Sequence, residues 1–164
     1  MDFEIEHRIE APVEEVAEAL LDPGYQASLD GIGALGERSL VSQESRGDGE
    51  VIRRVRCVLG VDPGPAKRFL GGAEPAWIEE ARWDPETLRW GWVIHPEVGR
   101  AFLRAEGAIE LLAERAGTRR RVTGKVEVRV PGFGARVESI IVDGIKAAYA
   151  DEAERLSDWV RSDR

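Results

Sequence analysis

The stretch Phe133-Gly134-Ala135-Arg136-Val137-Glu138-Ser139-Ile140-Ile141, which continues to Trp159-Val160, carries the longest helical pattern in the chain. Its apolar and small residues recur at spacings of three and four, the period of one helix face. Because Pro131-Gly132 ends the run before it, we expect the helix to begin sharply. A helix of about 28 residues is about 42 Å long and needs a broad apolar surface to lie on. The stripe comprises Val137, Ile140, Ile141, Gly144, Ile145, Ala148, Tyr149, Leu156, Trp159 and Val160.

The length and composition indicate one globular domain over residues 1–164. No apolar run approaches the ~18–20 residues of a membrane helix, and the acidic, alternating N-terminus does not resemble a secretory signal. A single cysteine, Cys57, excludes an internal disulfide and fits a reducing cytoplasm, so we expect a cytoplasmic protein without integral membrane association. The net charge of −8 argues against nucleic acid as a partner. We interpret the basic run Arg119-Arg120-Arg121 as a solvated hairpin end.

The sequence pattern before the long helix predicts a sheet that packs against this helix. Residues 2–10 alternate as a half-buried strand, Ala11-Pro12 opens a helix, and Asp22-Pro23-Gly24 ends it. A short helical turn is expected over 25–29. The segment 61–75 forms a longer Gly- and Pro-rich connection, with a helical turn expected over 66–70 and a candidate role as a lid. Strand patterns cover 37–45, 51–59, 77–83, 88–94, 101–113 and 122–130.

Strands joined by short turns pair antiparallel, and a sheet with one apolar face needs one covering layer. The long C-terminal helix is the only predicted element large enough. A strongly twisted sheet around a single helix leaves space between them, so we expect an internal cavity.

A glycine-rich segment, Gly31-Ile32-Gly33-Ala34-Leu35-Gly36, matches the dinucleotide-binding pattern letter for letter. That pattern binds a pyrophosphate only between a buried strand and a helix. Here a helical segment precedes it and a polar strand follows. We therefore interpret it as a loop that leads into a strand.

Two sequence pieces resemble a known superfamily. They are Phe3-x-x-x-x-x-Ile9-x-Ala11-Pro12-x-x-x-Val16, and Val130-Pro131-Gly132-Phe133-Gly134 followed by Val137-Glu138-x-x-Ile141. With the element order, they resemble the START-like superfamily of lipid-transfer domains, pollen-allergen-type proteins, and polyketide cyclases and aromatases. The second piece is similar to an uncharacterised branch known mainly from actinobacteria.

This resemblance implies an α+β helix-grip fold. Its sheet would be curved, antiparallel and about seven-stranded, wrapped around the long C-terminal helix, with one or two short helices after the first strand. The resemblance also implies a pocket between sheet and helix. It carries over no catalytic residue.

The inward strand positions predict the polar part of that pocket. His7, Arg53 and Glu79 share faces with apolar residues, where an unpaired charge is costly. We expect Arg53 and Glu79 to meet in the pocket, where one or both orient the polar end of a ligand. The alternatives are a strand register different from the predicted one, or a structural ion pair at the cavity mouth. His7 is either an acid–base group or a wall residue.

The apolar part of the pocket is predicted from the aromatic strands and the helix stripe. Aromatic residues on one sheet face usually form core, but they also stack on flat ligands. Cys57, on an apolar face, is expected to stay protonated and inert. The predicted apolar ligand contacts are Trp77, Trp90, Trp92, Ile109, Val137, Ile141 and Ile145.

The sequence offers no zinc-type ligand spacing and no nucleophile motif, so we predict no metal, no cofactor and no catalytic residue. The function expected first is binding or carriage of a small hydrophobic or amphipathic molecule, such as a lipid or polyketide-like aromatic. One alternative is an enzyme of the cyclase or dehydratase kind that uses the same pocket, with His7 or Glu79 as its polar group. Another is a protein-interaction module without a ligand. The sequence does not define the oligomeric state.

Overall fold

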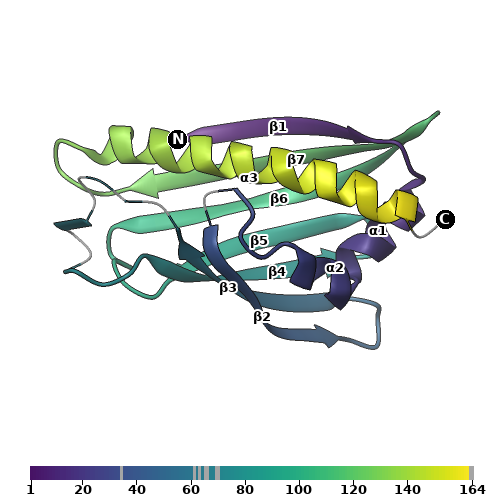
Figure 1. Cartoon of the computed structure of the whole chain (residues 1–164), viewed down its shortest axis with the longest axis horizontal. Helices are drawn as coiled ribbons and strands as arrows, with labels where there is room; N and C mark the ends of the chain where they lie inside the picture. The colour runs from purple at the N-terminus through teal and green to yellow at the C-terminus, as the bar shows by residue number, and fades with distance from the viewer. Residues whose placement is uncertain (34, 61, 63, 65–66, 69–70, 163–164) are drawn as a thin grey trace.

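The computed structural model describes residues 1–164 except 34, 61, 63, 65–66, 69–70 and 163–164. Within the described residues, seven strands and three helices follow one another in the order predicted (Figure 1). The helical turn expected at 66–70 falls mostly on residues outside the described ones. The strands are β1 Asp2–Ile9, β2 Leu35–Ser45, β3 Val51–Leu59, β4 Ala76–Asp84, β5 Arg89–Pro96, β6 Leu103–Glu114 and β7 Gly117–Val128.

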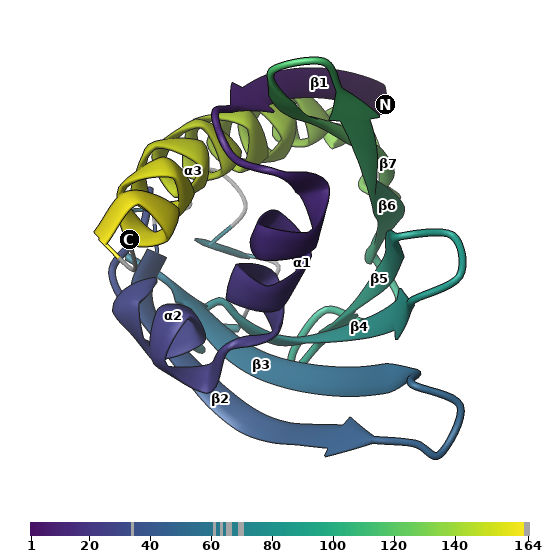
Figure 2. The same cartoon turned by 90° about the vertical axis from the view of Figure 1, so that its right-hand side faces the viewer.

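The strands form one antiparallel sheet in the order β1-β7-β6-β5-β4-β3-β2. Consecutive strands from β2 to β7 are neighbours, which follows from their short connections. Only β1 joins out of sequence, beside β7, with His7 opposite Arg120. The sheet curls strongly, and the long C-terminal helix lies across the open side between the two outer strands, β1 and β2 (Figure 2).

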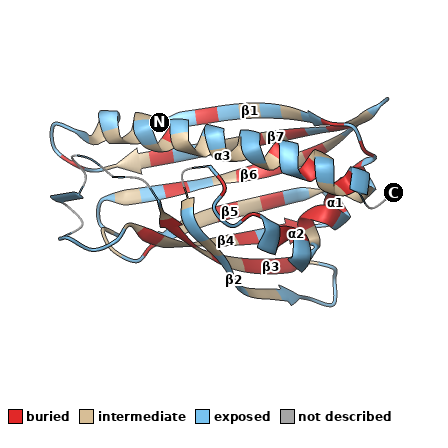
Figure 3. Ribbon diagram, in the orientation of Figure 1, coloured by how far each residue is buried: buried red, intermediate tan, exposed pale blue. Residues whose placement is uncertain are grey.

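The helix α3, Gly134–Ser162, has 29 residues and runs along the concave side of the sheet against β1 and β7 (Figure 1). The predicted helix-grip fold, a seven-stranded curved antiparallel sheet with a long C-terminal helix, is confirmed. The helix stripe is buried less evenly than its spacing predicts (Figure 3). Val142, Ala153, Leu156 and Val160 are buried, whereas Ile140 is 55% exposed.

Two short helices close one end of the curled sheet (Figure 2). They are α1, Val13–Leu21, and α2, Pro23–Ser28. Asp22 ends α1 and also caps α2, because its side chain accepts hydrogen bonds from the Gly24 and Tyr25 amides at 2.6 and 3.1 Å. The second helix therefore begins earlier than the turn expected over 25–29, and it buries Tyr25 and Gln26.

Paired glycines allow two aromatic rings to lie on the concave face of the sheet. Gly107 on β6 is opposite Gly124 on β7. A Cβ atom at Gly107 would lie 2.5 Å from the Trp92 ring, and one at Gly124 would lie 2.6 Å from the Phe3 ring. Since both positions lack a Cβ, Phe3 and Trp92 stack with ring centroids 6.4 Å apart.

The basic run differs from its prediction. Arg119-Arg120-Arg121 lies inside β7, and the side chain of Arg120 is 0% exposed, whereas Arg119 is exposed and Arg121 is half-buried. Because successive residues of a strand point to opposite faces, only the middle arginine enters the interior. Among the described helices, none is long and apolar enough to cross a membrane.

Candidate functional site

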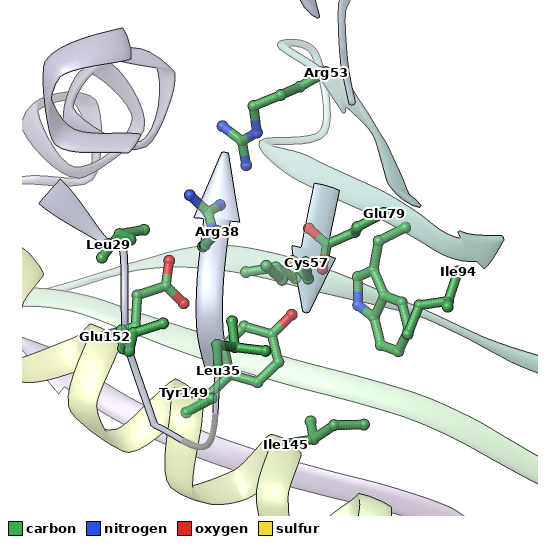
Figure 4. Close-up of a pocket in the computed structure, with 14 residues that line it drawn as sticks. Leu29, Leu35, Arg38, Arg53, Cys57, Glu79, Ile94, Ile145, Tyr149 and Glu152 are labelled. Atoms are coloured by element: carbon green, nitrogen blue, oxygen red, sulfur yellow. The ribbon is translucent and has the colours of Figure 1, made fainter. Parts of the chain in front are cut away.

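A cavity of about 110 Å³ lies between the concave sheet face, α3 and the segment that joins α2 to β2 (Figure 4). Its apolar wall combines strand residues with one side of α3. Charged residues from both layers border the same space. The cavity is lined by Leu29, Ile32, Leu35, Arg38, Arg53, Cys57, Glu79, Trp92, Ile94, Ile109, Ile145, Ala148, Tyr149 and Glu152.

Half of the predicted ligand contacts border this cavity: Arg53, Glu79, Trp92, Ile109 and Ile145. Whether they contact a ligand remains a prediction. Arg53 and Glu79 do border one space, as expected, but among the described residues no ion pair joins them. Arg53 and Glu79 therefore do not form the structural ion pair that we considered as one alternative.

The other predicted contacts lie elsewhere. His7 lies against Arg120, with Nδ1 and Nη2 3.4 Å apart. Trp90 is buried beneath Arg53, whose guanidinium carbon is 4.2 Å from the centroid of the indole ring. Trp77 is half-buried on β4 opposite Cys57, and Val137 and Ile141 are half-buried on the first turns of α3.

Arg53 and Arg38 are held at the cavity by neutral acceptors. Arg53 is 6% exposed and donates from Nη1 to the Leu20 carbonyl oxygen at 2.7 Å. Arg38 donates from Nη1 and Nη2 to the carbonyl oxygen and side-chain oxygen of Gln26, both at 2.8 Å. The Gln26 amide in turn donates to Leu20 at 2.9 Å. The two short helices thus position both guanidinium groups, and burial lowers the pKa of Arg53 to about 10.

Three further polar side chains face the cavity from its other sides. Glu79 on β4 makes no hydrogen bond or ion pair with any described residue. The Tyr149 side chain points from α3 toward the cavity (Figure 4), and burial raises the pKa of its hydroxyl well above the usual 10. Burial also raises the pKa of the Cys57 thiol to about 12, so it stays protonated at neutral pH.

A second buried polar group joins α3 to the sheet behind the cavity. Arg120 donates from Nη2 to the Tyr149 carbonyl oxygen at 2.8 Å. Its Nη1 lies 3.1 Å from Glu152 Oε2, an ion pair without hydrogen-bond geometry. The Tyr25 hydroxyl donates to the Glu152 carbonyl oxygen at 3.3 Å. Arg120 therefore fixes the two helix residues, Tyr149 and Glu152, that present polar groups to the cavity.

Burial and the positive charge of Arg120 lower the pKa of His7, while Glu152 acts in the opposite direction. A neutral imidazole beside a buried guanidinium fits a wall residue. Among the described residues, no group of three or more His, Cys, Asp or Glu side chains could hold a metal ion.

Sequence reasoning missed Arg38, Arg120 and Glu152. The last two carried a usable signal. Glu152 follows Ile145 by seven positions on α3, and Arg120 shares the inward alternation of Val122. Arg38 carried no such signal in the sequence. The register between β2 and β3 shifts at Leu35/Glu37 and again at Leu40/Ser42, so simple alternation does not predict which face of β2 Arg38 lies on.

A family model described as "Protein of unknown function (DUF2505)" matches residues 4–160. The chain belongs to this family. The comparison with curated proteins gives no match. The narrower resemblance to an actinobacterial branch stays a prediction.

Solved structures share the fold over nearly the whole chain. The protein TTHA0849 from Thermus thermophilus is 24% identical with a TM-score of 0.71, covering 99% of this chain and 98% of that one. The Zhui aromatase/cyclase from Streptomyces sp. R1128 is 13% identical with a TM-score of 0.69, covering 98% and 93%. A START superfamily protein from Mycobacterium smegmatis is 13% identical with a TM-score of 0.62, covering 99% of both chains. At these identities the likeness establishes a START-like fold.

Proposed function

We propose that the protein binds a small amphipathic molecule in the cavity between sheet and α3. The observation that carries this proposal is the cavity itself, which combines apolar lining residues with three charged side chains, Arg38, Arg53 and Glu79, that form no ion pair with a described residue. Ligand pockets typically have such a wall, with a few polar groups that fix orientation. A core without a ligand function has no need of Arg53 and Glu79 around a shared space, because buried charges are costly.

The test is native mass spectrometry on protein purified from its own organism, followed by extraction and identification of any adduct. A reproducible adduct is expected for the wild type. Ile145→Trp should remove it, because Ile145 lines the cavity and a larger ring fills the space. Ile140→Trp is the matched control on the same helix, since Ile140 is 55% exposed. Equal adducts on both variants would place the ligand outside the cavity.

A second candidate is turnover of a bound substrate, of the cyclase or dehydratase kind. Its support is Glu79, whose carboxylate borders the cavity without a hydrogen bond to any described residue. Such a group is available to accept a proton from a substrate. His7, the other group considered for this role, contacts Arg120 and is not among the lining residues. Glu79→Gln should abolish turnover by an enzyme while leaving ligand retention by a carrier intact.

A further inference from the structure

The cavity contains two guanidinium groups without a carboxylate partner. Arg38 and Arg53 both border it (Figure 4). Burial lowers the pKa of Arg53, the charge of Glu79 acts against this lowering, and the charge of Arg38 adds to it. Among the described residues, neither forms an ion pair. Their acceptors are the neutral oxygens of Leu20 and Gln26.

Buried polar atoms around Arg53 that make no hydrogen bond with a described residue include donors and one acceptor, Gln43 Oε1, whose residue is opposite Arg53 on β2. Nε of Arg53 and Nε1 of Trp92 make no hydrogen bond with any described residue, and both are fully enclosed. A buried donor without an acceptor costs free energy. The support for an anionic acceptor is the pair of guanidinium groups themselves, which line one cavity and donate only to neutral oxygens of the protein.

The carboxylates of the cavity do not fill this role. Glu152 is paired with Arg120 at 3.1 Å. Glu79 faces the cavity from β4, and it forms no ion pair with either arginine among the described residues. Counting Arg120 with the two lining arginines and the two lining glutamates, the formal charge around the cavity is positive by one, from three arginines and two glutamates.

The cavity also limits the size of the ligand. Its volume is about 110 Å³, whereas an engineered cavity of about 150 Å³ takes up benzene. The apolar body of a ligand held here is therefore no larger than about one ring. A long acyl chain would not be enclosed in this volume.

We infer that the cavity binds a small carboxylic acid, with its carboxylate between Arg38 and Arg53 and a ring-sized apolar body against Trp92, Ile109 and Ile145. This inference rests on the proposed function and deepens it by naming the ligand class. Arginine suits the role because its planar fork donates two parallel hydrogen bonds to one carboxylate.

The test uses three ring-sized probes of nearly identical shape. Benzoate, benzamide and benzamidine present a negative, a neutral and a positive group on the same ring. Each is titrated into the wild-type protein at pH 7, and binding is followed by amide chemical shifts and calorimetry. We expect benzoate to bind at least about tenfold more tightly than benzamide, since charge-assisted hydrogen bonds are the stronger ones. Benzamidine should bind weakest.

Variants localise the effect. Arg53→Met and Arg38→Met should each weaken benzoate by about tenfold and reduce its preference over benzamide. Arg54→Met is the matched control, because Arg54 is the next residue of β3, is half-buried and pairs with Glu80 on the outer face. Glu79→Gln should leave benzoate binding unchanged or strengthen it, since a like charge is removed. A loss at Glu79→Gln as large as that at Arg53→Met would contradict the inference.

The outcomes separate this inference from the proposed function. Benzamide or benzamidine binding as tightly as benzoate, with loss in Ile145→Trp, overturns the acid but keeps the cavity as the binding site. No binding of any probe to the wild type also overturns the ring-sized acid, and mass spectrometry of the purified protein then decides the proposed function by itself.

Discussion

Arg120 is the residue whose neighbours differ most from what its local sequence suggests. It lies between the exposed Arg119 and the half-buried Arg121, yet its own side chain is fully buried against Glu152 and the Tyr149 carbonyl. Removing one partner of a buried pair leaves the other charge uncompensated.

We therefore expect Arg120→Met to lower the free energy of unfolding by about 3 kcal/mol or more. Arg119→Met is the control, because Arg119 is 45% exposed and surface pairs contribute at most about 1 kcal/mol. Urea unfolding followed by circular dichroism measures both. Similar losses for the two variants would show that burial of Arg120 contributes nothing.

His7 should make stability depend on pH. Its pKa is lowered from 6.5 by burial and by Arg120, so the unfolded chain binds more protons than the folded chain just below pH 6.5. By linkage, the protonation of His7 in the unfolded chain lowers the free energy of unfolding as the pH falls through that value. We expect His7→Gln to lose less stability between pH 7 and pH 5 than the wild type, in thermal unfolding across that range. Parallel pH profiles would contradict the predicted direction.

Among the elements, the glycine pair of β6 and β7 decides how Trp92 lies in the sheet. A Cβ atom at Gly107 would lie 2.1 Å from the Thr123 carbonyl oxygen and 2.5 Å from the Trp92 ring. Neither group can retreat cheaply, because one is backbone and the other is a buried ring.

We expect Gly107→Ala to cost about 1–3 kcal/mol of stability and to change the fluorescence of the buried tryptophans. Gly91→Ala is the matched control on the adjacent strand, where a Cβ atom would meet nothing within 4 Å. That substitution should stay within about 0.5 kcal/mol. Equal losses of stability at the two positions would mean that the close approach of the Trp92 ring to Gly107 does not contribute to the effect.

Across the molecule as a whole, the sheet, α3 and the two short helices all contribute to one cavity. Because this cavity exists only in the folded chain, a ligand that binds in it stabilises the folded state relative to the unfolded state. Benzoate at 100 times its dissociation constant should therefore raise the free energy of unfolding by about 2.7 kcal/mol. Ile145→Trp should show no such increase, and Ile140→Trp should show the full one. Denaturant unfolding with and without the probe measures the difference, and stabilisation that survives in Ile145→Trp would exclude this cavity as the site.

The element order and the layers could be predicted from the amino-acid sequence. The period-two strands, the three-four spacing after Gly134 and the short turns were enough to predict an antiparallel sheet around one long helix. Alternation also placed Arg53 and Glu79 inward, and the same rule extended to Arg120 would have placed it inward as well.

The pairing of the charges and the size of the cavity depend on how the chain packs in three dimensions. Bulges in β2 turn Arg38 inward against its simple alternation, and Arg120 finds its partners on a helix about thirty residues further along the chain. A local pattern indicates the face of each side chain. The partner across the core depends on sheet register and on where α3 rests, and both are set by packing between segments far apart in sequence.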